Sequence, residues 1–312
     1  LRTVGAARER FDEDALRLLR AMRFAATHHF MPAPGLEAAM LAAAPGLSRI
    51  AAERIEREFS LLFQRAERPS IGLNLALRCG LIAIVLPELL PLVGQAQNRF
   101  HAFDCWTHTM AAVDAVPAGH VAVRWAALLH DLGKPPSAQE HPDRPGEYQF
   151  FGHEKISVEQ TALVAKRLRF SSQRQAHVER LVATHMLHPN PDWGDAALRR
   201  LLVKVGDGGL DDFLLLKRAD IAAKGTDDVP MIQRDVDQIE QRLRAELAKG
   251  AALSRKDLAV TGDDLVQSLG RSPGPWLGPL LANLLAHVVD EPSQNTQARL
   301  ITLARAHLED QD

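Results

Sequence analysis

Apolar residues recur along most of the chain with the spacing of a helix. In residues 11–29, for example, Leu16, Leu19 and Met22 follow one another at intervals of three, which places them on one face of an α-helix. The same pattern predicts further helices over residues 36–44, 51–66, 70–80, 103–116, 121–131, 153–168, 173–187, 195–205, 209–224 and 228–249. No segment shows the strong two-residue alternation expected of a half-buried strand. The sequence therefore predicts an all-α fold.

Proline and glycine interrupt this pattern at a few places. The polar segment 133–152 contains several of both, and we expect a loop without a helix there. The apolar segment 81–93 is short for a membrane span and contains Pro87, Glu88 and Pro91, so we interpret it as buried helix ends. These breaks, together with the motifs described below, predict three parts: residues 1–92, 93–227 and 228–312.

The composition indicates where in the cell the protein is expected and which binding partners suit it. The chain has 312 residues, of which 46% are hydrophobic and only 5% aromatic, so its core must consist mainly of Leu, Ala, Val and Ile. The net charge of −2 means that binding to nucleic acid must rest on local patches of Lys and Arg. Cys79 and Cys105 give no disulfide framework, and no basic, apolar leader opens the sequence. We expect a cytoplasmic protein that does not bind membranes.

Candidate chemistry centres on histidine and aspartate, whose side chains bind divalent transition metals. Six such residues lie on predicted helices or at helix ends: His108, His130, Asp131, His153, His185 and Asp220. A single histidine on an apolar helix is more often structural, but a helical bundle can bring several ligands together in its interior. The order and spacing of all six predict a metal site. The metal stays open among Mn, Fe, Ni, Co and Zn.

The adjacent pair His130 and Asp131 suggests what such a site could do. Neighbouring residues of a helix point about 100° apart, and the carboxylate of Asp131 has two oxygens that could bridge two metal ions. Two metals about 3.5–4 Å apart suit the hydrolysis of phosphoesters, because they activate water and neutralise phosphoryl charge. Lys134, one turn further on, could add a positive charge. Asp131 and Lys134 are therefore the candidate catalytic residues.

Residues 100–224 resemble the HD superfamily of metal-dependent phosphohydrolases, which is named after this His-Asp pair. The resemblance implies one metal held by His108, His130, Asp131 and Asp220, and a second held with His153 and His185. We expect one or two ions. His101 and His188 lie near these ligands in the sequence and could line the pocket. The other histidines are expected at the surface: 28, 29, 120, 141, 177, 287 and 307.

A second resemblance lies near the start of the sequence. The stretch "FDEDALRLLRAMRFAA" resembles a motif of bacterial CCA-adding tRNA nucleotidyltransferases and poly(A) polymerases, here formed by Glu13, Asp14 and Arg17. The resemblance implies that Asp14 and Arg17 read the Watson–Crick edge of an incoming CTP or ATP. Arg donates in a planar fork and a carboxylate accepts from an amine. We expect both residues one turn apart on one helix face.

The resemblance to this family continues through most of the sequence. "AAERIEREF" resembles the next motif, with Glu53, Arg54 and Glu58, which is expected to brace the nucleotide-reading helix. "VTGDDLVQSLGRSPGPWLGPLLANLL" resembles the end of the members that contain an HD domain. Within the all-α fold, the three parts then become a nucleotide-reading and RNA-binding neck, an HD-type helical bundle and a helical tail that binds tRNA.

The family's transferase chemistry depends on an N-terminal head with a Gly-Ser motif and two carboxylates that bind Mg²⁺, and these 312 residues contain no such head. We therefore expect the C-terminal part of a tRNA 3′-CCA nucleotidyltransferase, which selects CTP or ATP and binds the tRNA acceptor arm. Alone, it would not transfer nucleotides. Its HD site would hydrolyse phosphoesters, such as 2′,3′-cyclic phosphates or small nucleotides.

Two alternatives remain. The chain could be a non-catalytic tRNA-binding module with a structural or vestigial metal site. It could also be a stand-alone HD hydrolase, although the Glu13-Asp14-x-x-Arg17 motif and the "TGDDL" tail argue against this. The sequence leaves open whether the parent protein adds CCA, CC, A or poly(A), and it leaves open the oligomeric state.

Overall fold

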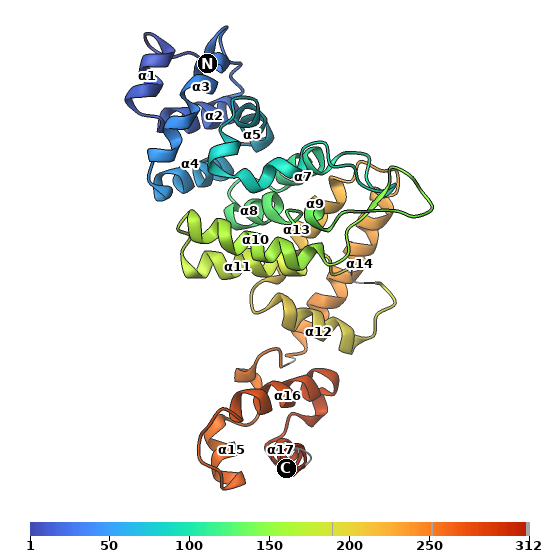
Figure 1. Ribbon diagram of the computed structural model, residues 1–312. Helices are drawn as coiled ribbons and strands as arrows, with labels where there is room; N and C mark the ends of the chain where they lie inside the picture. Colours follow the sequence, from blue (N-terminus) through green and yellow to red (C-terminus); the bar gives the residue numbers. More distant parts are fainter. Residues whose placement is uncertain (189, 251, 310–312) are drawn as a thin grey trace. The chain divides into compact units, whose positions relative to one another are not determined.

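The computed structural model describes residues 1–188, 190–250 and 252–309. These residues form α-helices, short 3-10 helices and a single pair of two-residue strands, which confirms the predicted helical fold (Figure 1). They divide into two compact units. The first unit comprises residues 1–187 and 212–233, and the second comprises residues 188–211 and 234–312. The predicted boundaries after residues 92 and 227 stay predictions.

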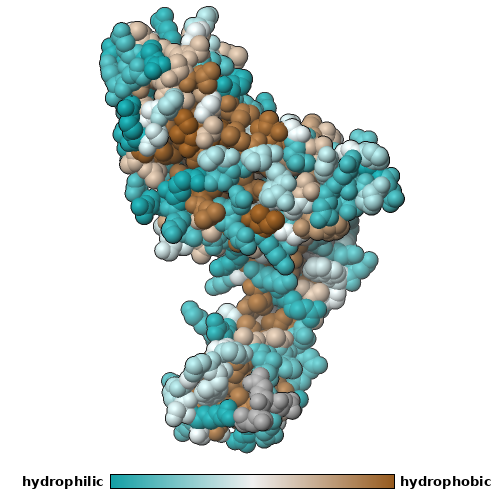
Figure 2. Space-filling model, viewed as in Figure 1, coloured by the Kyte–Doolittle hydropathy of each residue, from teal (hydrophilic) through white to brown (hydrophobic). Residues whose placement is uncertain are grey.

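The first unit begins with a group of short helices. They are α1 (Ala7–Glu13), α2 (Leu16–His28), α3 (Leu36–Ala43), α4 (Ala52–Arg65), α5 (Pro69–Arg78) and α6 (Ile82–Val85), with 3-10 helices at Ala44–Arg49 and Pro87–Leu92. Helix α2 packs against α4 and α5 through a core that includes Leu19, Met22, Phe59 and Phe63. Figure 2 shows apolar side chains among polar ones over this group. The last two short helices lie where buried helix ends were expected.

The helix predicted over residues 11–29 is in fact two helices. The backbone of Asp14 is extended (φ −148°, ψ 101°), and this residue ends α1. Its Oδ1 atom accepts a hydrogen bond from the backbone N–H of Leu16 at 3.1 Å, in the first turn of α2. An aspartate offers this bond more readily than it continues a helix. The expectation that Asp14 and Arg17 lie on one helix face is therefore wrong.

The rest of the first unit is a helical bundle. It contains α7 (Cys105–Ala115), α8 (Val121–Leu129), α9 (Lys134–Ser137), α10 (His153–Arg167), α11 (Ser172–Thr184) and all but the first two residues of α13 (Leu210–Ala222). Helix α11 packs against both α8 and α10, and α7 packs against α8. We expected the segment 133–152 to be a loop without a helix, and this expectation is wrong. The segment begins with the one-turn helix α9, where prolines occupy the tolerant first turn, and it contains an antiparallel pair, β1 (Gln139–Glu140) and β2 (Tyr148–Gln149).

A buried arginine joins the two parts of the first unit. The guanidinium of Arg124, on α8, donates hydrogen bonds to the carbonyl oxygens of Phe63, Ala66, Glu67 and Val116 at 2.6–3.3 Å. Burial lowers its pKa to about 10. The bonds to Phe63 and Ala66 satisfy carbonyl groups at the C-terminal end of α4, and those to Val116 satisfy the end of α7.

The second unit has its own core. Its helices are α12 (Asp195–Val205), the greater part of α14 (Val229–Ala248), α15 (Gly262–Leu269), α16 (Leu277–Asp290) and α17 (Gln297–Glu309), with 3-10 helices at Arg255–Asp257 and Pro292–Gln294. Leu265, Leu284 and Leu300 lie in one apolar cluster. Thr261 and Asp264 form a capping box at the start of α15. No helix in the described part of the chain has the length and apolar character to span a membrane.

Candidate metal centre

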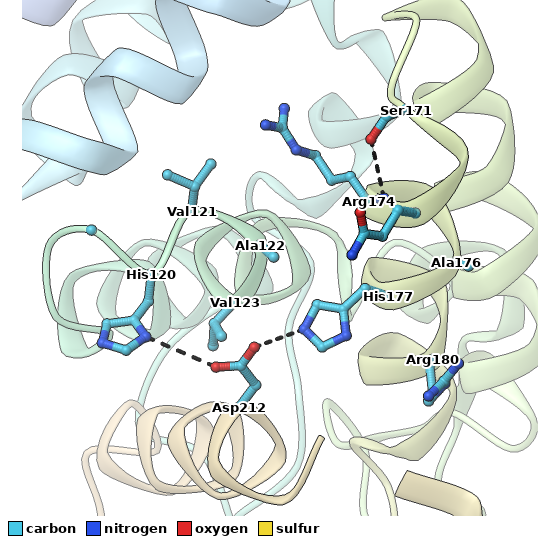
Figure 3. A pocket seen from close by; sticks show the side chains of 12 residues that line it. His120, Val121, Ala122, Val123, Ser171, Arg174, Ala176, His177, Arg180 and Asp212 are labelled. Atoms are coloured by element: carbon cyan, nitrogen blue, oxygen red, sulfur yellow. Dashed lines mark hydrogen bonds and ion pairs between the residues drawn. The ribbon is translucent and has the colours of Figure 1, made fainter. Parts of the chain in front are cut away.

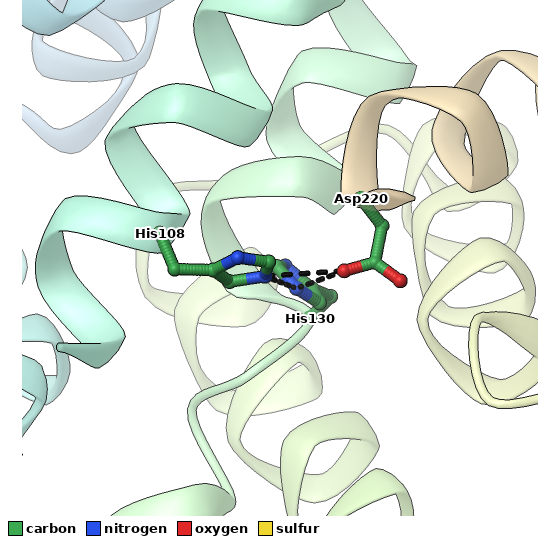
Figure 4. Close-up of side chains that lie close together, drawn as sticks. All are labelled: His108, His130 and Asp220. Carbon is green, nitrogen blue, oxygen red and sulfur yellow. Dashed lines mark hydrogen bonds and ion pairs between the residues drawn. The ribbon is translucent and has the colours of Figure 1, made fainter. Parts of the chain in front are cut away.

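All six predicted ligands converge inside the bundle of the first unit, and all are buried. They form two groups. In the first group, Asp220 Oδ1 lies 3.1 Å from His108 Nε2 and 3.7 Å from His130 Nε2 (Figure 4). The two Nε2 atoms are 3.4 Å apart. Three ligand atoms from α7, α13 and the end of α8 therefore face one point, as the coordination of one cation requires.

The second group consists of Asp131, His153 and His185. Asp131 Oδ1 lies 3.5 Å from His153 Nε2 and 3.9 Å from His185 Nε2. The other oxygen, Oδ2, lies 3.1 Å from His130 Nε2 and 3.6 Å from His108 Nε2 in the first group. Each oxygen of Asp131 therefore faces a different group, which is the arrangement needed to bridge two cations.

Backbone carbonyl oxygens fix the orientation of the four imidazole rings. In each ring, Nδ1 lies within hydrogen-bonding distance of a backbone carbonyl oxygen. The pairs are His108 with Ala223 (3.2 Å), His130 with Ala127 (2.9 Å), His153 with Phe150 (2.8 Å) and His185 with Val182 (2.6 Å). A carbonyl oxygen can only accept, so Nδ1 carries the proton in every case. Each Nε2 atom can then direct its lone pair into the centre, as a metal ligand must.

Local sequence places these side chains. His130 and His185 are the residues that end α8 and α11, so both rings project beyond the last turn of an apolar helix. Gly133 then allows the chain to pass close to the start of α10, because a Cβ atom there would lie 2.1 Å from the carbonyl oxygen of His153. The backbone N–H of Gly133 donates to Ser157 Oγ at 2.9 Å. The glycine after the His-Asp pair is therefore needed to bring His153 to the centre.

Lys134 lies inside the site, as predicted. Its Nζ atom is 2.7 Å from Asp131 Oδ2 and donates to Gln97 Oε1 at 2.6 Å. Despite the short distance to Lys134, Asp131 Oδ2 has no hydrogen bond of acceptable geometry in the described part of the chain. A buried carboxylate oxygen without a hydrogen bond is costly. The donor set and this oxygen therefore fit a divalent cation.

Electrostatics distinguish the two groups. Burial alone would lower the pKa of His130, but the nearby carboxylates of Asp131 and Asp220 raise it to about 10, so without a metal Nε2 also carries a proton, which a bound cation would displace. Burial would raise the pKa of both carboxyls, yet the neighbouring histidines, and Lys134 beside Asp131, hold each well below its usual range. Burial lowers the pKa of His153, and it lowers that of His185 to about 3. Both carboxylates are therefore ionised, which suits cation binding.

Sequence reasoning missed two buried polar residues of the site. Gln97 accepts the bond from Lys134 and lies between the 3-10 helix Pro87–Leu92 and α7. Lys217 donates to the carbonyl oxygen of His185 at 3.1 Å, and burial lowers its pKa to about 8. Lys217 lies three residues before Asp220, about one helical turn, so the spacing was a signal. Gln97 gave none, because it lies 37 residues from Lys134.

The two histidines that could line the pocket, His101 and His188, lie in different parts of the structure. The ring of His101 stacks edge-on against His108, with 5.1 Å between the ring centroids. Burial, followed by the charge of Lys134, lowers its pKa to about 3, so this ring is neutral. His101 therefore lines the centre, as expected. His188 belongs to the second unit.

The predicted nucleotide-reading residues lie on a different surface. Arg17 Nη1 is 2.7 Å from Glu13 Oε2, and Arg54 Nη2 is 3.2 Å from Asp14 Oδ2. The side chains of this group, which we call the arginine–carboxylate network, are 33–51% exposed. Hydrogen bonds from Arg17, then Arg10, lower the pKa of Glu13. The network joins the α1–α2 junction to the first turn of α4.

The predicted bracing residues differ in their exposure to solvent. Glu58 Oε2 accepts from Arg23 Nε at 2.8 Å, and both side chains are less than a tenth exposed. This pair joins α4 to α2, a partner that the sequence motif did not name. Glu53, in the first turn of α4, is exposed. The structure thus brings Arg54 to Asp14 and Glu58 to the helix that carries Arg17.

Comparison with known proteins adds a family. Residues 150–304 match the family model described as "tRNA nucleotidyltransferase domain 2 putative", and residues 29–92 match "Probable RNA and SrmB- binding site of polymerase A". An A-adding tRNA nucleotidyltransferase of Deinococcus radiodurans is 31% identical over 297 residues, which cover 92% of this chain and 67% of that protein. The chain belongs to the tRNA nucleotidyltransferase family.

Other family members agree. A CC-adding tRNA nucleotidyltransferase of Thermus thermophilus is 33% identical over 89% of this chain and 63% of its own length. A multifunctional CCA protein of Cupriavidus pinatubonensis is 34% identical over 68% of this chain and 52% of its own length. The chain therefore spans about two thirds or less of the length of these tRNA nucleotidyltransferases.

Proposed function

We propose that this chain is the nucleotide-selecting and tRNA-binding part of a tRNA 3′-CCA nucleotidyltransferase and that it carries an HD-type metal-dependent phosphohydrolase centre. One observation supports the hydrolase most strongly. Four imidazoles, each with Nδ1 held by a carbonyl oxygen, direct Nε2 toward two carboxylates in a buried site. Purely structural histidines have no need of this common orientation.

The ligands divide between two ions. His108, His130 and Asp220 would hold one, and His153 and His185 the other, with Asp131 contributing an oxygen to each. Divalent ions bound there would supply Lewis-acid chemistry and a water of lowered pKa. Lys134 would keep a positive charge beside Asp131, where negative charge develops on a phosphoryl group. The substrate class is a phosphoester, such as a 2′,3′-cyclic phosphate or a small nucleotide.

Nucleotide selection is assigned to the arginine–carboxylate network. Asp14 and Arg17 present an acceptor and a planar donor, and a nucleobase edge could replace the exposed ion pairs at little cost. Glu13 pairs with Arg17 and Arg54 with Asp14, whereas Glu58 braces α2 through Arg23. We assign Glu53 a bracing role from the motif alone. The nucleotides would be CTP or ATP, the macromolecular partner the tRNA acceptor arm, and the location the cytoplasm. Transfer itself would need a Mg²⁺-binding head.

Metal content and hydrolysis test the centre together. The purified chain and the variants His130→Ala and His287→Ala would be analysed for metal and assayed with bis(p-nitrophenyl) phosphate and a 2′,3′-cyclic nucleotide. His287 is an exposed histidine of the second unit and serves as the matched control. We expect close to two ions per chain and metal-dependent hydrolysis, both lost in His130→Ala only. A wild-type chain that binds no metal after metal addition would contradict the proposal.

A tRNA-binding module without hydrolase activity is the second candidate. The match of residues 29–92 to a probable RNA-binding site favours it. A gel-shift assay with tRNA at two salt concentrations separates the candidates, because binding through phosphates weakens steeply with salt. Salt-dependent binding without hydrolysis would support the module. Hydrolysis with or without tRNA binding would support the metal centre.

A further inference from the structure

Three helices of the bundle carry a second set of the same residue types at their opposite ends. Helices α8, α11 and α13 supply His130, His185 and Asp220 to the metal centre. His120 immediately precedes α8, His177 lies on α11, and Asp212 lies in the first turn of α13. These residues come ten, eight and eight positions earlier, which corresponds to about 12–15 Å along each helix. They are therefore outside the metal centre.

The second set forms a compact cluster. His177 Nε2 lies 2.7 Å from Asp212 Oδ2, and His120 Nδ1 lies 3.9 Å from Asp212 Oδ1 (Figure 3). The hydrogen bond from His177, followed by the charges of the two histidines, lowers the pKa of Asp212, although part of that effect is offset by burial. The carboxylate is thus ionised, it orients the ring of His177 through a hydrogen bond, and it lies within ion-pairing distance of His120. Both histidines had been expected to be ordinary surface residues.

The cluster lies in a cavity of about 760 Å³. Arg174 and Arg180, also on α11, line the same cavity, and Asp212 is the one acidic residue among its described lining residues. Arg174 is held by Glu56, which lies outside this lining, and by Ser60 at 3.3 Å. With Arg174 already paired with Glu56, Arg180 and two histidines against the single carboxylate of Asp212 make a site suited to an anion.

The helix directions reinforce this charge. The first residues of α8, Val121 to Val123, line the cavity, as do Ser171 and Arg174 at the start of α11. The first-turn N–H groups of a helix have no acceptor within that helix, and the N-terminal end carries partial positive charge. The opposite, C-terminal ends of α8 and α11 carry the metal ligands. The same helices therefore favour a cation at one end and an anion at the other.

We propose that this cavity binds a phosphate group through His120, His177 and Arg180. The arginine offers a planar pair of donors that matches phosphate oxygens. Asp212 would keep the rings turned toward the ligand. The phosphate could belong to an RNA backbone or to a small phosphate ester, which share this chemistry. The proposal does not depend on hydrolysis at the metal centre.

Titration calorimetry of inorganic phosphate into the full chain, at constant ionic strength, tests the site. The informative variants are His177→Gln combined with Arg180→Gln, and Arg180→Glu alone. Arg180 is exposed, so the single change lies at the surface. Arg8→Gln, which removes an exposed arginine on α1, is the matched control. We expect phosphate affinity to fall about tenfold or more in both cavity variants and to stay unchanged in the control.

The variant His130→Ala separates this site from the metal centre. It should lose metal but keep phosphate binding, whereas the cavity variants should keep their metal content. Phosphate binding that is absent from the wild type, unchanged in Arg180→Glu, or lost in His130→Ala alone would overturn the proposal.

A second arm identifies the source of the phosphate. If the cavity variants also weaken tRNA binding, and inorganic phosphate competes with tRNA, the ligand is an RNA backbone. If tRNA affinity stays unchanged while phosphate binding is lost, the ligand is a small phosphate ester.

Discussion

The metal centre and the arginine–carboxylate network use similar groups in opposite surroundings. In the centre, Asp131 is 1% exposed and His108 is fully buried, and a carboxylate oxygen is left without a hydrogen bond. In the network, the side chains of Arg17 and Glu13 are 39% and 46% exposed, and each has a partner. Burying charge is costly, so we expect the centre to bind a cation that offsets this cost. The exposed network can exchange partners freely.

The largest effect is expected where the two groups of ligands meet. Asp131→Asn removes the charge that faces both groups, so we expect both ions to be lost and hydrolysis to fall by about 1,000-fold or more. His153→Ala touches only the second group and should lose one ion. Metal analysis of both variants measures this difference. Equal metal loss in the two would show that the groups do not bind ions separately.

A second prediction concerns the buried pair beneath the network. Glu58→Gln removes the charge that faces Arg23, and both side chains are nearly inaccessible to water. Breaking a buried pair leaves an uncompensated charge, so the free energy of unfolding should fall by about 3–5 kcal/mol. Urea denaturation measures it. A loss below about 1 kcal/mol would show that water reaches this pair. Burial would then not explain why ion pairs in the interior and at the surface differ in their contribution to stability.

A smaller effect is expected beside the metal ligands. Lys134→Gln keeps a donor near Gln97 but removes the charge next to Asp131. We expect about 10–100-fold slower hydrolysis with metal content preserved, as for residues that support a metal ligand. Steady-state kinetics and metal analysis check this together. If Lys134→Gln lowers the metal content as well as the hydrolysis rate, Lys134 positions the metal ligand Asp131 rather than supplying charge.

The smallest effect is expected in the network itself. Arg54→Gln removes the 3.2 Å contact with Asp14 Oδ2, in which the Arg54 side chain is half exposed. Exposed ion pairs contribute little, so unfolding free energy should change by about 0.2–1 kcal/mol. Nucleotide binding, measured by titration with CTP and ATP, is the informative readout. A stability loss as large as that of Glu58→Gln would erase the contrast between the regions.

Most of the candidate metal ligands could be predicted from the sequence, because they lie on or at the ends of helices that the spacing of apolar residues reveals. His130 and Asp131 end such a helix, and their order with the other four ligands carried the prediction. Gln97 and the pairing of Arg23 with Glu58 were not predictable, because contacts between distant segments leave no local pattern. The break at Asp14 was missed because the apolar period runs across it. There a side-chain bond to the N–H of Leu16 outweighed helix continuation.

The hydrogen bonds of Arg124 have a consequence for how the first unit opens. One guanidinium holds the end of α4 and the turn before α8, so neither can separate without leaving several carbonyl oxygens unpaired in the interior. Local opening is drawn from regions with few such ties. The N-terminal helices and the bundle should therefore exchange their amide hydrogens as one cooperative block, and thermal motion that frees one should melt the other.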